Sequence, residues 1–133
     1  MAFVADNSVI VGWFMPNQAN ELTRKALRLS RRERVHVPAL WQSEFANVLV
    51  GLERRGLSAG HQVDVIVAKA ERLGLEVHDA FTSVSPLIGL MRARGIKGYD
   101  ATYLHLAATL NAPLYTRDGS LRAAARSVGL TAP

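Results

Sequence analysis

The chain has 133 residues, of which 49% are hydrophobic and 20% are charged, and it contains no Ser-, Gln- or Pro-rich tract. This composition excludes a disordered chain, and the length suits a single hydrophobic core. The apolar runs are too short to cross a bilayer, and the N-terminus lacks the basic start and apolar stretch of a signal peptide. We therefore expect one domain over residues 1–133, in the cytoplasm and not bound to a membrane.

Basic residues exceed acidic ones, which gives the chain a formal charge of +5 and a sequence pI of about 10.2. A charge of this sign favours polyanionic partners. The densest basic segment is 24–34, and it suits either phosphate contacts or a solvated helix face. The absence of cysteine excludes disulfides and thiolate metal sites, so any bound metal must have oxygen or imidazole ligands.

Short apolar segments alternate along the chain with longer stretches of helical spacing. We predict strands at residues 3–5, 35–37, 75–77, 113–115 and near 128–130. We predict helices from an Asn20 cap to about residue 30, from 38 to 55, from Ser58 onward, from after Thr82 to about 94, and from about 99 to 110. The alternation predicts an α/β fold: a three-layer α/β/α sandwich with a central, mainly parallel sheet.

Two acidic residues follow predicted strands. Asp6 comes directly after the first strand, and Asp118 comes shortly after the strand that ends at Tyr115. Ligands of open α/β sheets bind beyond the carboxyl ends of the strands. We therefore expect both carboxylates to reach one crevice.

Two further acids lie on apolar helix faces. Glu44 is three residues after Trp41 and four before Val48, so it shares their side of its predicted helix. Asp100 is four residues before Leu104 and is placed in the same way, although a role as the cap of its helix explains its position almost as well. Capping does not explain Glu44.

A buried carboxylate without a partner costs several kcal/mol, in the range of roughly 2–7, or becomes protonated. The stripes that carry Glu44 and Asp100 contain no Lys or Arg, so a bound cation explains them better than salt bridges do. Carboxylate ligands with positions left for water suit Mg²⁺, with Mn²⁺ as an alternative. Such ions support phosphodiester hydrolysis by polarising a phosphoryl oxygen and by lowering the pKa of water.

Four segments, FVADNSV, VPALWQSEFANVL, GYDATYLHLA and PLYTRDGSL, resemble in order the motifs of PIN-domain ribonucleases, and most closely those of VapC-type toxins. They span residues 3–121. The resemblance implies that Ser8 and Thr116 lie beside the metal site, where the alternative for their hydroxyls is local capping or turn bonding. It implies that the catalytic, metal-binding acids are Asp6, Glu44, Asp100 and Asp118.

The same resemblance implies a single PIN domain over residues 1–133 and a Mg²⁺-dependent endoribonuclease that acts as the toxin of a type II toxin–antitoxin pair. The implied partners are the RNA substrate, a cognate antitoxin that occupies the cleft, and a second copy in a homodimer or a heteromer with the antitoxin. Arg117 and the basic segment 24–34 are candidates to contact the RNA backbone.

Other interpretations are a catalytically inactive PIN-like module that binds RNA or protein, and a phosphorylated receiver domain. The four intact acids argue against the first, and the absence of a second acid beside Asp6 argues against the other. Aromatic residues such as Tyr99 and Tyr103 are assigned to core packing. The histidines show no metal-ligand spacing with one another: His36, His61, His78 and His105.

Overall fold

Four parallel strands form the centre of the fold in a computed structural model that describes residues 1–79 and 83–133. The strand order is β3-β2-β1-β4. The strands are β1 (Ala2–Ala5), β2 (Arg34–Pro38), β3 (Glu76–His78) and β4 (Leu114–Tyr115). The inner strands β1 and β2 are apolar apart from Arg34 and His36 and are buried at consecutive positions, as expected where helices cover both faces of a parallel sheet.

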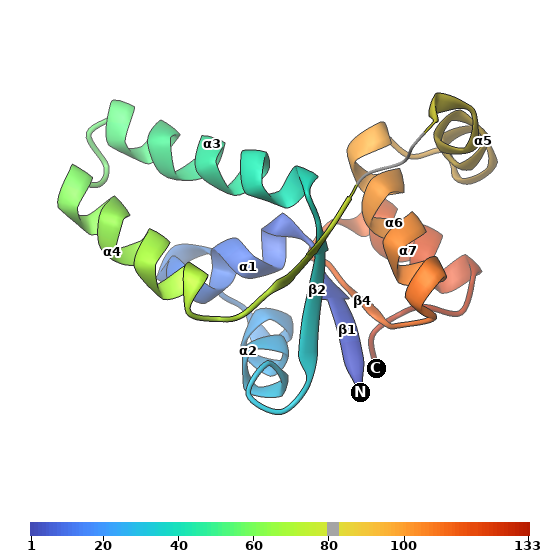
Figure 1. Ribbon diagram of the computed structural model, residues 1–133, viewed down its shortest axis with the longest axis horizontal. Coiled ribbons are helices and arrows are strands. Elements are labelled where there is room, and N and C mark those ends of the chain that lie inside the picture. The colour runs from blue at the N-terminus through green and yellow to red at the C-terminus, as the bar shows by residue number, and fades with distance from the viewer. Residues whose placement is uncertain (80–82) are drawn as a thin grey trace.

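Helices cover both faces of this sheet (Figure 1). One layer contains α1 (Asn7–Phe14), a short 3-10 helix (Pro16–Gln18), α2 (Glu21–Leu29), α3 (Leu40–Arg54) and α4 (Gly60–Glu71). The other layer contains α5 (Val84–Arg94), α6 (Gly98–Leu110) and α7 (Gly119–Ser127). Right-handed crossovers explain this division, because the chain moves from β1 to β2 and β3 in one direction and then returns to β4. The predicted α/β/α sandwich is confirmed.

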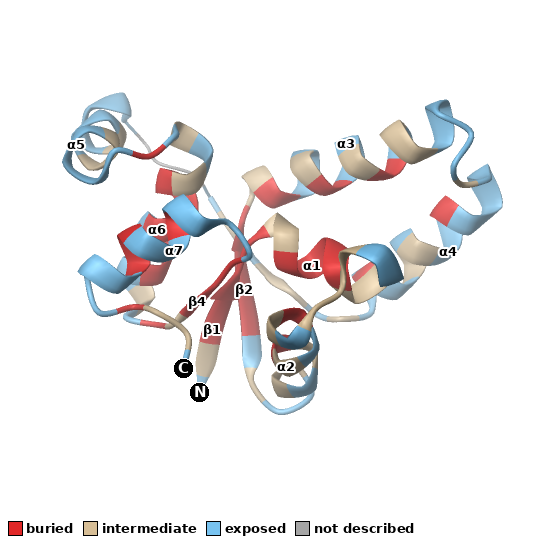
Figure 2. Cartoon of the chain, turned by 180° about the vertical axis from the view of Figure 1, so that it is seen from behind, coloured by how far each residue is buried: buried red, intermediate tan, exposed pale blue. Residues whose placement is uncertain are grey.

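The core lies where the helices meet the sheet, and Figure 2 shows the buried residues concentrated on β1, β2, β4 and the facing sides of α1 and α6. Its largest fully buried side chains include Phe3, Ile10, Leu49, Leu104 and Tyr115. Across residues 1–79 and 83–133, no helix has both the length and the hydrophobicity that a bilayer-spanning segment requires.

Two helices, α1 and α7, were not predicted from the sequence. Each begins directly after an aspartate whose side chain accepts a hydrogen bond from the helix's first turn: Asp6 from Val9 N, and Asp118 from Leu121 N. Asp is a preferred N-cap residue, and the apolar residues that follow both aspartates have helical spacing. The signal was therefore present in the sequence, although both aspartates had been interpreted only as site residues.

The strand predicted near residues 128–130 is wrong. Gly129 has a φ of +74°, which an extended strand does not allow, and it follows the end of α7. The chain then touches the sheet at isolated points: Leu114 N donates to Leu130 O at 2.8 Å, and Thr131 forms a single bridge with Leu114.

The predicted start of the helix at Pro38 is two residues too early. Pro38 still pairs with His78 in the sheet, and α3 begins at Leu40. Ala39 N donates to His78 O at 2.6 Å, so strand pairing continues up to the helix. The start predicted after Thr82 lies outside the described residues, and α5 is described from Val84.

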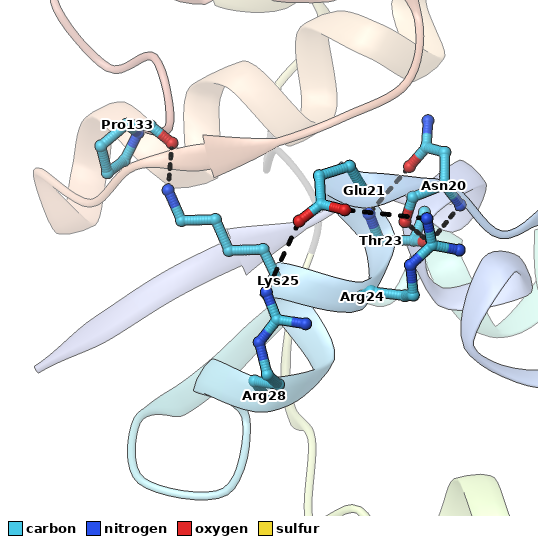
Figure 3. A network of polar contacts seen from close by, with 7 residues as sticks. All are labelled: Asn20, Glu21, Thr23, Arg24, Lys25, Arg28 and Pro133. Atoms are coloured by element: carbon cyan, nitrogen blue, oxygen red, sulfur yellow. Dashed lines mark hydrogen bonds and ion pairs between the residues drawn. The ribbon is translucent and has the colours of Figure 1, made fainter.

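The start of α2 follows the predicted Asn20 cap (Figure 3). Asn20 Oδ1 accepts from Thr23 N, and Thr23 Oγ1 accepts from Asn20 N, both at 2.9 Å. This reciprocal pair satisfies two backbone donors that the helix itself leaves free. Lys25 Nζ, further along α2, donates to Pro133 O at 2.6 Å and ties the helix to the C-terminal segment.

We predict that Gly12→Ala reduces the free energy of unfolding by about 1–3 kcal/mol, because α1 packs closely against α2 at this position. A Cβ on Gly12 would lie 2.7 Å from Thr23 Cγ2 and 2.9 Å from the backbone oxygen of Gln18. The matched control is Gly51→Ala in α3, where a Cβ meets nothing within 4 Å. The control should gain about 0.5–1 kcal/mol from the higher helix propensity of Ala.

Urea unfolding of the two variants measures both effects. Equal stability of the Gly12→Ala variant and the unmodified protein would contradict the close approach of α1 and α2.

Candidate functional site

The candidate site lies where β1 and β4 end side by side. The chain leaves β1 towards α1 in one helix layer and leaves β4 towards α7 in the other, so this edge is the point at which the sheet topology reverses. Asp6 N donates to Tyr115 O at 3.1 Å, which continues the β1–β4 pairing to the last residues of the strands. Open α/β sheets form their ligand crevices at such points.

All four acids predicted from the sequence line one cavity of about 330 Å³ at this edge. They come from four separate places: the end of β1, the second turn of α3, the first turn of α6 and the start of α7. Other residues that line the cavity include Ser8, Gln18, Tyr103 and Arg117. The structure therefore brings together Asp6, Glu44, Asp100 and Asp118.

Asp6 is the most buried of the four, with 6% of its surface exposed. Its Oδ1 accepts hydrogen bonds from Ser8 Oγ at 2.6 Å and Val9 N at 3.2 Å, and its Oδ2 accepts from Thr116 Oγ1 at 2.5 Å. Burial raises the pKa of Asp6 to about 6, although these hydrogen bonds favour the charged form. Three donors thus fix the orientation of the Asp6 carboxylate, although burial makes its ionisation unfavourable.

The hydroxyls of Ser8 and Thr116 join the two turns beyond the strands. Ser8 Oγ accepts from Arg117 N, and Thr116 Oγ1 accepts from Asp118 N, both at 3.0 Å. Each hydroxyl therefore accepts one bond from the turn after β4 and donates one to Asp6. One contact of each hydroxyl lies within its own turn, as local capping or turn bonding predicts, and the other joins the two turns.

Glu44 is held by Tyr103, a residue that the sequence interpretation had assigned to the core. Tyr103 Oη donates to Glu44 Oε1 at 2.6 Å. Burial raises the pKa of Glu44, and this hydrogen bond opposes the rise. Burial and the bond to Glu44 also raise the pKa of the Tyr103 hydroxyl, so it stays a donor. Tyr103 lies three residues after Asp100 on α6, and this helical spacing was the available signal.

Asp100 is not the cap of α6. The N-cap position is occupied by Lys97, and Asp100 lies in the first turn, facing the cavity. Burial and then the charge of Asp118 raise the pKa of Asp100, whereas Lys97 lowers it. Asp100 therefore does not cap α6, although it lies in the first turn, where an acidic residue is favourable.

Asp100 is the electrostatic centre of the group. Its charge raises the pKa of both Asp6 and Glu44, and its own pKa is raised by Asp118. Glu44 and Asp100 are half-buried and Asp118 is exposed. Glu44 and Asp100 therefore border an open cleft, whereas helical spacing predicted that these two acids point into the closed interior. Each of the four carboxylates is therefore repelled by at least one other carboxylate of the group.

None of these four acids forms an ion pair with Lys or Arg in the described part of the chain. The acids that form such ion pairs there are Glu21 and Glu76. Arg117 lines the cavity, but its Nη1 donates to Gln18 Oε1 at 3.0 Å. The site therefore offers carboxylate oxygens, mutual repulsion and few counter-charges. This donor set fits a hard divalent cation such as Mg²⁺ or Mn²⁺.

The basic segment 24–34 lies apart from this cavity. Arg24 and Arg28 each lie 3.8 Å from Glu21 on the exposed face of α2 (Figure 3). Residues 31–34 lead into β2 and so lie at the amino ends of the parallel strands, opposite the cavity. Among the basic residues proposed to contact RNA, Arg117 is the one that lines the cleft.

Comparisons with known proteins agree with this architecture. The family model described as PIN domain matches residues 3–127. The chain is 28% identical over 123 residues to Ribonuclease VapC3 from Pyrobaculum aerophilum, which covers 91% of this chain and 92% of that protein. The crystal structure of PAE2754 from Pyrobaculum aerophilum has the same fold, with a TM-score of 0.66 at 19% identity, covering 93% of this chain and 84% of that one.

We predict that the metal-free protein loses stability as the pH rises from 3.8 to about 6, because Asp6 then ionises in the unfolded chain while burial keeps it protonated in the fold. Its pKa is 3.8 when unperturbed and about 6 when folded, so between these values the folded state binds more protons than the unfolded state. The free energy of unfolding therefore falls with increasing pH in this window. The Asp6 contribution at neutral pH is at most about 3 kcal/mol.

Urea unfolding in EDTA across this pH range, compared with the Asp6→Asn variant, isolates the contribution. The variant should lack this part of the pH dependence. Parallel curves for the two proteins would contradict the raised pKa.

Proposed function

This chain belongs to the PIN domain family, and on that premise we propose that it is a metal-dependent endoribonuclease that acts as the toxin of a toxin–antitoxin pair. The observation that carries the proposal is the convergence of four carboxylates from separate elements on one cleft, with no ion pair to Lys or Arg among the described residues. The name of the relative Ribonuclease VapC3 supports the same activity.

The proposed cofactor is Mg²⁺, with Mn²⁺ as an alternative. A bound divalent cation of this kind polarises a phosphoryl oxygen and lowers the pKa of water at the site. The residues that would hold it are Asp6, Glu44, Asp100 and Asp118. Their uncompensated negative charge repels RNA phosphate in the absence of a cation, which gives a physical reason for metal dependence.

The surrounding residues orient these ligands. Ser8 and Thr116 fix both oxygens of Asp6, and the Tyr103 hydroxyl fixes Glu44. Arg117, at the rim of the cleft, is the proposed contact for an RNA phosphate. Hydrolysis adds water across the P–O3′ bond, so the products carry a 5′-phosphate and a 3′-hydroxyl.

The proposed partners follow from the same charges. An excess positive charge of +5 over the whole chain attracts RNA, although the cleft itself is acidic. An antitoxin that occupies the cleft would compensate the same carboxylates, for example with a Lys or Arg side chain. We also propose that the toxin forms a homodimer or a heteromer with the antitoxin, as the resemblance to VapC-type toxins implies.

We predict that Asp100→Asn reduces Mg²⁺-dependent RNA cleavage by at least about 100-fold, more than the loss of an outer-shell partner of a metal causes. Asp100 interacts electrostatically with the other three acids, and its removal eliminates a ligand while it also relieves repulsion. The folded protein should therefore remain at least as stable as the unmodified protein. The matched control is Asp64→Asn on the exposed face of α4.

Cleavage of a defined RNA, with analysis of the product ends, measures the effect. Full activity of the folded Asp100→Asn variant, or activity in EDTA, would overturn the proposal and favour a binding module without catalysis.

We predict that Tyr103→Phe raises the Mg²⁺ concentration needed for half-maximal cleavage by about 10-fold or more, because Glu44 loses the donor that orients it. Tyr99→Phe is the matched control, because Tyr99 lies on the same helix and is 61% exposed. A Mg²⁺ titration of cleavage rates tests the difference. An unchanged Mg²⁺ requirement for the Tyr103→Phe variant would show that this hydrogen bond does not position Glu44.

A further inference from the structure

A second group of metal-ligating side chains lies outside the acidic cleft, on the edge strand of the sheet and its neighbour. His36 is in β2, and Glu76 and His78 are in β3. The parallel register pairs His36 with Glu76, and alternate residues of a strand point to the same face. Val77, between them, lines a groove with α3 and α4, whereas His78 lines a cavity with residues of α6. The three side chains therefore share the α6 face.

Their ligand atoms converge on one point. His36 Nδ1 lies 2.7 Å from His78 Nε2 and 3.5 Å from Glu76 Oε2. One ligand atom from each residue lies within 4.8 Å of the other two. We propose that His36, Glu76 and His78 form a second cation site, which binds a transition metal and prefers Zn²⁺. The sequence spacing of the histidines gave no sign of this group, because the pairing of β2 with β3 brings His36 and His78 together.

The types of donor decide which cation suits each site. Imidazole nitrogens bind Zn²⁺ and related transition metals well, whereas Mg²⁺ prefers an all-oxygen shell. Two imidazoles and one carboxylate, with a fourth position left for water, form a common ligand set for Zn²⁺. The acidic cleft contains only oxygen donors at its four carboxylates. The two sites therefore differ in chemistry, and this inference does not rest on the proposed nuclease activity.

The present spacing needs only a small adjustment to accept the ion. Tetrahedral Zn²⁺ with Zn–N distances of about 2.0–2.1 Å places two nitrogens roughly 3.3 Å apart. The nitrogens of His36 and His78 would separate from 2.7 Å, where they share one hydrogen bond. His36 is 7% exposed and held within the sheet, but His78 is half-buried and ends its strand, so its ring has room to turn.

Arg34 orients the carboxylate ligand. Arg34 Nη1 lies 3.1 Å from Glu76 Oε1, which leaves Oε2 facing His36. Burial lowers the pKa of His36 and the charge of Arg34 lowers it further, but the Arg34 side chain is 76% exposed, so water weakens its repulsion of a bound cation. Glu76 is thus held in place without losing the oxygen that faces the imidazoles.

A bound ion would link β3 to the rest of the sheet. β3 has three residues and pairs with β2 alone, as the edge strand of the described sheet. Ligands from both strands would be joined through one cation. Because the metal binds the folded arrangement, it should raise the unfolding temperature.

The test is a Zn²⁺ titration of the full chain with excess Mg²⁺ present, followed by NMR of the histidine ring nitrogens. We predict that the ring signals of His36 and His78 change on Zn²⁺ addition while those of His61 do not. The His78→Gln variant should bind Zn²⁺ at least about 10-fold more weakly by calorimetry. The matched control His61→Gln, on the exposed start of α4, should bind as the unmodified protein does.

Two results would overturn the site. Unchanged ring signals for His36 and His78 at saturating Zn²⁺ would show that the two imidazoles form only a hydrogen bond. Equal Zn²⁺ affinities for the His78→Gln and His61→Gln proteins would place the ion elsewhere. Glu76→Gln provides a second variant if His78→Gln fails to fold, and it should also weaken binding.

Discussion

The carboxylate of Asp6 is the constraint on which the rest of the site depends. β1 and β4 pair at two positions, Val4 with Leu114 and Ala5 with Tyr115. Strand pairing alone therefore does little to position the turns that follow the two strands. The hydroxyls of Ser8 and Thr116 extend this contact into the two turns, because each donates to Asp6 and accepts from the turn after β4. The same carboxylate caps α1. One buried group thus aligns a strand end, a helix start and the turn that carries Asp118.

This arrangement concentrates negative charge that the fold itself does not neutralise. Burial and mutual repulsion raise the pKa of Asp6, Glu44 and Asp100, and the described ion pairs lie elsewhere. The apolar core must offset this cost, because the acids contribute no stabilising pair of their own. A cation would remove the repulsion, so the groups that weaken the metal-free fold are those that suit it for metal-dependent chemistry.

The sequence predicted the features that depend on local spacing. Four of the five predicted strands, the layer architecture and the side of its helix on which Glu44 lies followed from periodicity, whereas the strand predicted near 128–130 did not form. Contacts set by tertiary packing were missed: the hydroxyl of Tyr103 reaches Glu44 from another helix, and His36 meets His78 only because the α3–α4 crossover sets the register of β3. The helices α1 and α7 were missed for a different reason, because their capping aspartates were assigned a single role when they have two.

The most direct test of the central claim is a crystal structure of the protein grown with Mn²⁺, in which anomalous scattering locates the ion. The account predicts a Mn²⁺ peak in the cleft at the carboxyl ends of β1 and β4, bound by the Asp6 carboxylate together with other acids of the cluster. A cleft without Mn²⁺, in which the carboxylates are each paired with an arginine or lysine, would contradict it.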